Sequence, residues 1–445
     1  MLEKRVDEFI KNPKKALWKI ALPMIVVFFV QTMYNVVDTA FVGRLGGNAL
    51  AALTFAFPLF FILISIGSGL GIGTNSRISR FLGAKKIKEA ENSAIHGLII
   101  SVVLAIIIFI PCFIFLKPLF YLFGANLEVT KLGIEYMSII LIGLFFMLPN
   151  FVMNNIFISQ GDSKTPMKVQ IFALILNMVL DPIFIYVFGL GVRGAAIATL
   201  CAWFFETIAY SYLIHKKSYL HINFNNFNFS SKIVRNIIFV GFPASLSMLL
   251  ISVYVGFINR IVAVFGTEYV AGIGIAWKLE NAAVMPTIGL SLAALTLVGL
   301  FHGAKRYDLI RYTVNYVLKI SMIFISIVGI IFFIIPKILL RIFTADPIIL
   351  SVAATYIRII VFSFPLMELF WTSNRVMQGI GSGLPSLVTN LIRIFVIAVP
   401  LAYVFVFVLG YGFSSVALAM VLGVIGGSMM SFIWLIIKLN KLETN

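Results

Sequence analysis

Twelve apolar stretches, each long enough to cross a lipid bilayer, constrain this chain more than any other feature. A transmembrane helix needs about 20 predominantly apolar residues, and clusters of charged residues, glycine and proline divide the sequence into segments of that length. The segments span residues 16–43, 48–76, 90–117, 130–157, 166–189, 192–214, 234–265, 268–300, 310–335, 349–374, 385–409 and 412–437. Because 61% of the residues are hydrophobic and only 11% are charged, the sequence predicts an all-α, polytopic membrane protein with twelve transmembrane helices.

Lysine and arginine residues concentrate in the loops on one side of these segments. An excess of positive residues marks cytoplasmic loops, so we expect both termini and the polar interval 215–232 to be cytoplasmic, in a protein of the plasma membrane. The net charge of +17 would suggest a nucleic-acid partner in a soluble protein. Since the positive residues here lie in short membrane loops, we expect membrane lipids among the partners and no nucleic acid.

The chain divides into two similar halves at the interval 215–232. At a shift of 220 residues the matched positions include Pro23 with Pro243, Gly46 with Gly266, Lys117 with Lys337 and Tyr136 with Tyr356. Later, the sequence QGDSKTP at 160–166 faces QGIGSGLP at 378–385, with one extra residue in the second copy. Shared glycine, proline and charged positions at constant spacing indicate an internal repeat.

The repeat predicts the domain organisation. We expect an N-lobe of six helices in residues 1–214, a cytoplasmic linker at 215–232 and a C-lobe of six helices in residues 233–445. Because each copy has an even number of spans, the two lobes should be parallel and related by a pseudo-two-fold axis along the membrane normal. This arrangement is typical of transporters.

Polar residues share helix faces inside two apolar segments of the first half. Gln31, Asn35 and Asp38 are spaced i, i+4 and i+7, and Asn177 and Asp181 are spaced i and i+4. A carboxylate in the middle of a membrane costs roughly 2.5–3.5 kcal/mol on insertion scales, so such residues are usually functional. We therefore interpret both acids as candidates for a cation site.

The second half lacks both acids. The shift of 220 places Asp38 opposite Ile258, and Asp181 falls near Pro400. Glycine and proline positions of the scaffold repeat, whereas the acids do not. This difference indicates a cation site that is confined mainly to the N-lobe.

Further oxygen atoms are expected close to these acids. Pro182 has no N–H, so the carbonyl group of Met178 loses its helical partner and can face a cavity. Hydroxyl and amide groups of the same half come from Tyr136, Asn150, Asn154 and Thr199. Oxygen-rich surroundings suit hard cations, and apart from a sodium ion at this site we expect no metal and no cofactor.

The sequence resembles the multidrug and toxic compound extrusion (MATE) transporters over essentially the whole chain. The most similar stretches are ALPMIVVFFVQTMYNVVDTAFVGRLGGNALAAL at 21–53, QGDSKTPM at 160–167 and LNMVLDPIFIYVFGLGVRGAAIAT at 176–199. Among them, the bacterial and archaeal branch with an aspartate in the first helix is the most similar. The resemblance implies two six-helix lobes that export amphipathic, often cationic compounds in exchange for protons or sodium ions.

The resemblance also implies residue roles. It assigns the cation-coupling site to Asp38, Asn177, Asp181 and Thr199, places Tyr136 and Asn154 in the cavity of the same lobe, and assigns a bend in the first helix to Pro23. From their polar side chains in the first and fourth apolar segments, we place Gln31, Asn35 and Asn150 in the same substrate cavity. The sodium-coupled branch of the family places key acids in the second lobe instead. Because Glu280 and Glu368 lie in apolar segments of the C-lobe, a contribution from that lobe stays open.

Two other functions compete with this reading. A lipid-linked oligosaccharide flippase of the same superfamily would need a strongly cationic cavity, for which the second half offers Arg260, Arg358, Arg375 and Arg393. An intramembrane enzyme would need a nucleophile and a base, but the sequence contains neither H-E-x-x-H nor G-x-S-x-G. We therefore predict a transporter and not an enzyme, and favour the antiporter, acting as a monomer on small organic substrates.

Overall fold

The computed structural model describes the backbone of residues 2–43, 45–122 and 126–443, and the side chains except those at 1–4, 32–40, 42–44, 122–125 and 443–445. Within these residues every regular element is a helix. The first half forms α1 (Leu2–Lys11), α2 (Pro13–Gly43), α3 (Gly47–Gly83), α4 (Ile87–Leu122), α5 (Leu127–Ser159), α6 (Lys164–Pro182), the π-helix η1 (Ile183–Val187) and α7 (Val192–Lys217).

The second half repeats this order after a loop that contains the short 3-10 helix η2 (Phe224–Asn226). Its helices are α8 (Ser231–Val262), the 3-10 helix η3 (Ala263–Phe265), α9 (Thr267–Gly303), α10 (Tyr307–Ile334), α11 (Pro336–Leu340), α12 (Pro347–Ile360), the 3-10 helix η4 (Val361–Ser363), α13 (Phe364–Ile380), α14 (Leu384–Leu391), the π-helix η5 (Ile392–Ala398), α15 (Val399–Tyr403), the π-helix η6 (Val404–Val408) and α16 (Ser414–Glu443).

Eleven helical spans in the described residues are long and apolar enough to cross a membrane, and α2 adds a further helix of 31 residues. The prediction of an all-α, polytopic membrane fold is confirmed. Several helices extend past the predicted segments. For example, α3 ends at Gly83 and α10 begins at Tyr307, several residues beyond the predicted bounds. Charged residues mark where the hydrocarbon ends, but a helix continues into the headgroup region until a turn stops it.

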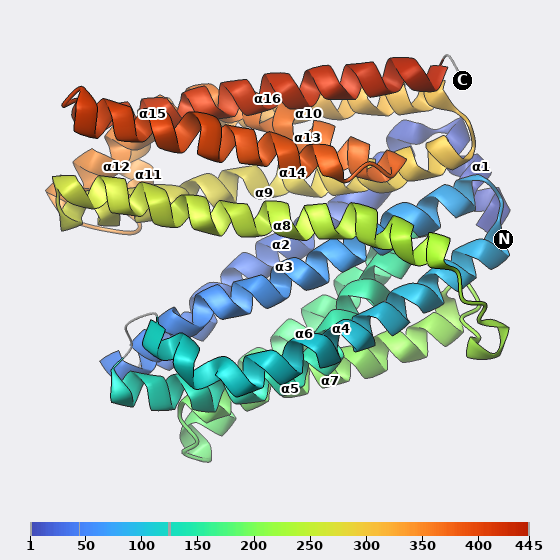
Figure 1. The fold of residues 1–445 in the computed structure, drawn as a ribbon, viewed down its shortest axis with the longest axis horizontal. Coiled ribbons are helices and arrows are strands. Elements are labelled where there is room, and N and C mark those ends of the chain that lie inside the picture. The colour runs from blue at the N-terminus through green and yellow to red at the C-terminus, as the bar shows by residue number, and fades with distance from the viewer. Residues whose placement is uncertain (1, 44, 123–125, 444–445) are drawn as a thin grey trace.

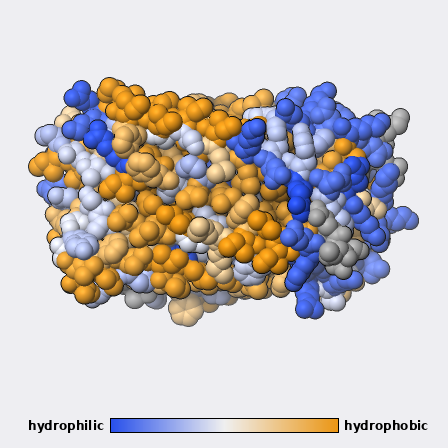
Figure 2. Space-filling model, turned by 90° about the horizontal axis from the view of Figure 1, so that it is seen from above, coloured by the Kyte–Doolittle hydropathy of each residue, from blue (hydrophilic) through white to orange (hydrophobic). Residues whose placement is uncertain are grey.

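The helices form two groups that lie side by side (Figure 1). α8 to α16 lie along one side and α4 to α7 along the other, while α2 and α3 run between them. Both termini and the loop between α7 and α8 lie at one end of the molecule. Figure 2 shows hydrophilic residues gathered at this end and a broad hydrophobic surface along the helices. This distribution fits helices whose outer faces contact lipid.

The backbone repeats the internal symmetry of the sequence. Lys85 and Lys305 have φ values of 58° and 57°, and Gly46 and Gly266 have φ values of 107° and 127°. Both pairs are related by the shift of 220 residues. A non-glycine residue rarely adopts a positive φ, so the matched lysines show that the same turn closes α3 in one half and α9 in the other.

The structure places the extra residue of the second half inside a helix, which corrects our expectation that it lies in the loop. Gly161 and Gly381, both with positive φ, keep the shift of 220 through that loop, whereas Gly189 and Gly410 follow a shift of 221. Between these points the second half contains the π-helix η5, and α6 has no counterpart to it. A π-turn accommodates one more residue than an α-turn. The new register places Ala402, rather than Pro400, opposite Asp181.

The two halves contact one another closely at the end that carries the termini. A Cβ atom at Gly83 would overlap the carbonyl oxygen of Leu300, and one at Gly303 would overlap that of Arg80. These two contacts are equivalent at the shift of 220, as a pseudo-two-fold axis between the halves requires. Closer to the other end of α9, a Cβ atom at Gly274 would meet nothing within 4 Å.

Hydrogen bonds join the halves near the same end. The hydroxyl group of Ser76 donates to the carbonyl oxygen of Gln378 over 2.5 Å, and the Nδ2 atom of Asn75 lies 3.1 Å from the Oγ1 atom of Thr296. Thr296 is fully buried and Asn75 nearly so. The contact between α3 and the second half therefore excludes solvent at this end.

We predict that the end with both termini is cytoplasmic. A cysteine at Asn225, an exposed residue of the loop between α7 and α8, should react with an impermeant maleimide only after the cells are permeabilised. A cysteine at Ala345, which is exposed between α11 and α12, should react in intact cells. Both variants are made with Cys112 and Cys201 changed to serine. Labelling of Asn225→Cys in intact cells would reverse the predicted orientation.

Candidate functional site

A buried carboxylate and amide pair lies at the end of α6. Asn177 and Asp181 are 3% and 0% exposed, and the Nδ2 atom of Asn177 donates to the Oδ1 atom of Asp181 over 3.4 Å. α6 ends one residue later at Pro182, and the chain continues as the π-helix η1. The spacing of i and i+4 thus brings the two side chains together, as the sequence predicted.

Residues of α5 and α7 contact the π-helix that follows this pair. Ile185 of η1 and Ala195 of α7 form a small apolar cluster, and the half-buried Tyr136 of α5 packs against this cluster. Thr199 lies one turn beyond Ala195 and donates its hydroxyl hydrogen to the Ala195 carbonyl oxygen over 3.1 Å. Because that bond uses only the donor of Thr199, its oxygen lone pairs remain available as acceptors.

The first-helix residues of the candidate site are only partly described. Gln31 is exposed on α2, whereas the side chains of Asn35 and Asp38 lie outside the described residues. The backbone of α2 is helical throughout Pro13–Gly43. The proximity of Asp38 to Asp181 therefore stays a prediction.

Pro23 lies buried inside α2, and a neighbouring hydroxyl group compensates for its missing N–H. A proline leaves the carbonyl oxygen four residues earlier without its helical donor, which in α2 is that of Lys19. The hydroxyl group of Ser163, at the start of α6, lies 3.3 Å from the Lys19 oxygen and 2.8 Å from the Ile20 oxygen. The weak point of α2 is thus held from outside the helix by the connection between α5 and α6.

A polar network joins α5 and α7 along the face that also carries Thr199. The Nδ2 atom of Asn150 donates to the Oε2 atom of Glu206 over 3.2 Å, and its Oδ1 atom accepts from the hydroxyl group of Thr207 over 2.8 Å. One turn further along α5, the Nδ2 atom of Asn154 donates to the Tyr210 hydroxyl group over 3.1 Å. Both asparagines are buried, so the network is internal to the first half.

Glu206 is a candidate that the sequence analysis missed. It lies seven residues after Thr199, a spacing that places both side chains on one helix face. The criterion that selected Asp38 and Asp181, an acid within an apolar segment, also applies to Glu206 in 192–214. Applying it to every segment would have identified this residue.

The acids of the second half have partners on separate helices. Glu368 is 1% exposed, and its Oε1 atom accepts a short hydrogen bond from the hydroxyl group of Thr287 on α9. The Oε2 atom of Glu280 accepts from the Tyr356 hydroxyl group over 3.3 Å, and Tyr356 in turn accepts from the indole of Trp277 over 2.8 Å. These contacts give both acids a local structural role and leave their participation in transport to experiment.

The arginines of the second half are not gathered in one cavity. Arg260 and Arg358 are exposed, and Arg375 donates to the side-chain oxygen of Gln378 over 3.0 Å. Arg393 alone among the four is buried, at 7% exposure. Within the described residues, no three His, Cys, Asp or Glu side chains come together as a metal site would require.

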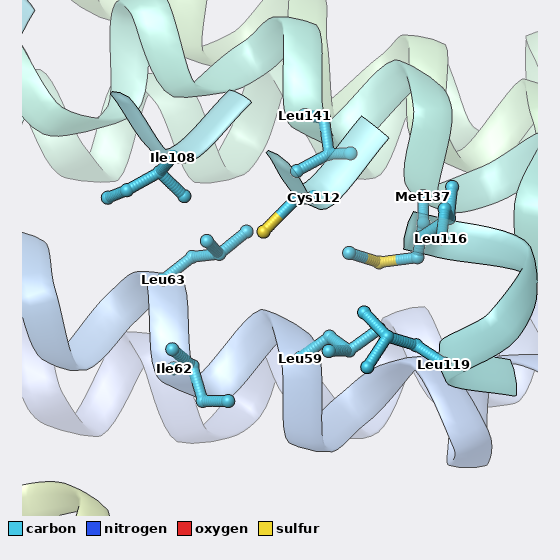
Figure 3. A pocket seen from close by; sticks show the side chains of 9 residues that line it. All are labelled: Leu59, Ile62, Leu63, Ile108, Cys112, Leu116, Leu119, Met137 and Leu141. Atoms are coloured by element: carbon cyan, nitrogen blue, oxygen red, sulfur yellow. The ribbon is translucent and has the colours of Figure 1, made fainter. Parts of the chain in front are cut away.

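A small pocket in the first half has a purely apolar lining (Figure 3). It lies between α3, α4 and α5, and its walls include Leu59, Leu63, Cys112 and Met137. None of these side chains offers an oxygen ligand for a cation. The candidate site is therefore the polar region around α6, η1 and α7 and not this pocket.

Comparisons with known proteins extend over both halves. The sequence profile of the family described as MatE matches residues 23–183 and 243–404. The chain is 28% identical over 406 residues to a "Probable multidrug resistance protein NorM" of Thermotoga maritima, covering 90% of this chain and 87% of that protein. It is 26% identical over 398 residues to the "FAD transporter" of Shewanella oneidensis, covering 87% of each.

The fold is also similar to that of solved structures. One, described as "Crystal structure of MATE in the bent conformation", superposes with a TM-score of 0.94 at 31% identity. The superposition covers 99% of this chain and 98% of that chain. The likeness therefore extends through all transmembrane helices of both halves.

Proposed function

The chain belongs to the MATE family of transporters, and from this premise we propose that it exports amphipathic, often cationic organic compounds in exchange for inward protons or sodium ions. The family makes it a cation-coupled multidrug efflux antiporter and not an enzyme. Within the family we assign it to the bacterial and archaeal branch with an aspartate in the first helix. It acts as a monomer in the plasma membrane, with both termini in the cytoplasm.

The buried pair Asn177 and Asp181 carries this proposal. A carboxylate in a membrane interior is retained against a cost of roughly 2.5–3.5 kcal/mol, and the second half has Ala402 at the position equivalent to Asp181. We assign the coupling ion to Asp38, Asn177, Asp181 and Thr199. Supporting this set, Asn177 donates to Asp181 and Thr199 lies on the face of α7 that packs on η1.

The exported compound binds in the same half. We assign the substrate cavity to Gln31, Asn35, Tyr136, Asn150 and Asn154, and we add Glu206 because Asn150 donates a hydrogen bond to it. Neutralising the acids with a proton or a sodium ion disfavours a cationic guest. The coupling is reciprocal, because a bound cation must weaken ion binding by the same factor. Exchange of ion for compound follows.

Residues 1–214 and 233–445 act as two lobes that rock about the linker at 215–232. In the present conformation they meet at the end with the termini, so the site opens towards the other end. Bending of α2 at Pro23 narrows the cavity of the first lobe after ion binding. The hydroxyl group of Ser163 supports the bend because it holds the Lys19 and Ile20 carbonyl groups on the cytoplasmic side of Pro23.

The flippase alternative finds less support in the structure. Its cargo carries a pyrophosphate and requires several cationic groups facing one cavity. Arg260 and Arg358 are exposed, and Arg375 pairs with Gln378. A single buried arginine does not supply the required field.

We expect transport in vesicles to identify the coupling ion. The purified protein is reconstituted, and export of a fluorescent cation such as ethidium is followed under a proton gradient alone or a sodium gradient alone. Either the proton gradient or the sodium gradient should drive accumulation of ethidium against its own gradient, and the other should not. We expect a single coupling ion because the same set of oxygen ligands binds and releases one ion in each cycle. Ethidium movement that ignores both gradients would contradict the antiport.

A further inference from the structure

Arg393 is a buried cation in the interior of the second half. It is the second residue of the π-helix η5 and is 7% exposed. Its guanidinium carbon lies 5.1 Å from the ring centre of Phe370 on α13 and 6.0 Å from that of Tyr254 on α8. On α16, a Cβ atom at Gly427 would lie 2.9 Å from the Arg393 Cβ and 3.1 Å from its Cγ. The absence of a side chain at Gly427 therefore leaves the path of the arginine open.

Among the side chains that the structure describes, no carboxylate contacts the guanidinium group of Arg393. Its Nη1 atom is buried and makes no hydrogen bond to the described residues, and none of their carboxylates pairs with Arg393 within 4.0 Å. An arginine stays charged in proteins, and a buried charge is normally paired. The rings of Phe370 and Tyr254 compensate for only part of the hydration that the buried guanidinium group has lost. The geometry thus leaves a donor in a desolvated place without an acceptor.

Glu280 influences Arg393 from a distance. The two side chains interact electrostatically, but the Oε2 atom of Glu280 accepts the hydrogen bond from Tyr356 and does not contact the guanidinium group. Glu280 is therefore a nearby negative charge that competes with any anion approaching Arg393. It is not the ligand of Arg393.

The equivalent place in the first half carries the opposite charge. At the shift of 221 that holds after η5, Gly427 corresponds to Glu206, and at the shift of 220 Phe370 corresponds to Asn150. In the first half, Asn150 donates to Glu206. In the second half, Arg393 fills the space beside the equivalent residues, Phe370 and Gly427. The first half thus has a carboxylate between α5 and α7, and the second half has a guanidinium group from η5 beside the equivalent helices α13 and α16.

We propose that Arg393, between the rings of Phe370 and Tyr254, is a subsite for an anionic group, either a carboxylate or a phosphate. The group belongs to a transported aromatic compound or to a lipid headgroup. The planar guanidinium group suits both acids because it can donate two parallel hydrogen bonds, and the rings of Phe370 and Tyr254, which are 1% and 7% exposed, surround it with apolar surface that excludes water. This subsite extends the proposed export function from cations to amphiphiles that carry an acidic group.

The test measures binding and requires no gradient. The full-length protein in nanodiscs of neutral phosphatidylcholine is titrated with pyrenebutyrate and with a pyrenyl trimethylammonium compound that has the same aromatic body. Arg393→Gln should weaken pyrenebutyrate binding about 10- to 100-fold, the range expected for loss of a charged hydrogen bond, and leave the cationic probe unchanged. Glu280→Gln should strengthen pyrenebutyrate binding, because the competing charge is removed.

Three controls separate binding from folding. Arg393→Lys keeps the positive charge and should retain much of the pyrenebutyrate affinity, and each variant must elute as the parent does in size-exclusion chromatography. Nanodiscs containing phosphatidylglycerol distinguish the two sources, since a lipid headgroup at Arg393 would displace the probe. Equal weakening of both probes in Arg393→Gln, or no change in either, would overturn the subsite. Failure of ethidium export in vesicles would instead refute the antiport and leave these binding results standing.

Discussion

We expect Asp181→Asn to reduce gradient-driven ethidium export to the level of empty vesicles while the protein stays folded. The substitution keeps the size of the side chain and removes the charge that the coupling ion must neutralise. Asn177 then faces an amide instead of a carboxylate, and its hydrogen bond can be kept with the amide oxygen. The measurement is the initial rate of ethidium accumulation in reconstituted vesicles under the gradient that drives the parent protein.

The chain offers a matched control for this variant. Asp346 is an exposed N-cap whose carboxylate accepts from the backbone N–H groups of Ile348 and Ile349, and Asn126 caps the equivalent helix of the first half. Asp346→Asn should therefore transport normally. Asp38→Asn is expected to behave as Asp181→Asn does, and Glu280→Gln should be milder. Normal transport in both aspartate variants with loss in Glu280→Gln would move the ion site to the second half.

Gly83→Leu should prevent the two halves from closing at the end with the termini. The new side chain would begin where the Leu300 carbonyl oxygen lies, and backbone atoms cannot yield as a flexible side chain can. Overpacking of this kind costs about 1–3 kcal/mol or more. Here the cost applies to the one conformation in which the two halves meet at this end. We expect transport to be lost because the outward-open state can no longer form.

Cysteine protection reports this effect directly. A cysteine at Thr296, which is fully buried beside Asn75, should be protected from maleimide in the parent protein and should react in Gly83→Leu. Gly274→Leu is the matched control, because a Cβ atom there meets nothing within 4 Å. Continued protection of Thr296→Cys in Gly83→Leu would show that this contact does not seal the molecule.

The sequence predicted those features that depend on local pattern. The apolar segments fixed the helices, and the i, i+4 spacing of Asn177 and Asp181 placed the pair on one face, where the structure finds it. The repeat at a shift of 220 anticipated turns that recur with the same backbone conformation at Lys85 and Lys305. Each of these inferences needs only neighbouring residues or a constant spacing.

Features that depend on packing between helices were missed. The hydrogen bond between Asn150 and Glu206 joins α5 to α7, and no residue spacing within one helix predicts a bond between two helices. The hydrogen bonds from Ser163 to the Lys19 and Ile20 carbonyl groups link residues 144 and 143 positions apart in sequence. The bonds from Asn75 and Ser76 to the second half link residues 221 and 302 positions apart. The burial of Arg393 likewise follows from Gly427 on another helix. Such relations become visible only when the faces of the helices are known.

The π-helix η5 also records part of the history of this chain. An extra residue inserted into an ordinary membrane helix would rotate everything after it by about 100°, and would turn a fully buried residue such as Ala402 towards lipid. The wide turn at Ile392–Ala398 absorbs the added residue, so the rest of the helix keeps its ancestral inward face. A duplicated copy can therefore change its length without losing its core. In this chain the wide turn contains Arg393, so the second half carries a charge where the first half has the apolar residues Phe172 and Ala173.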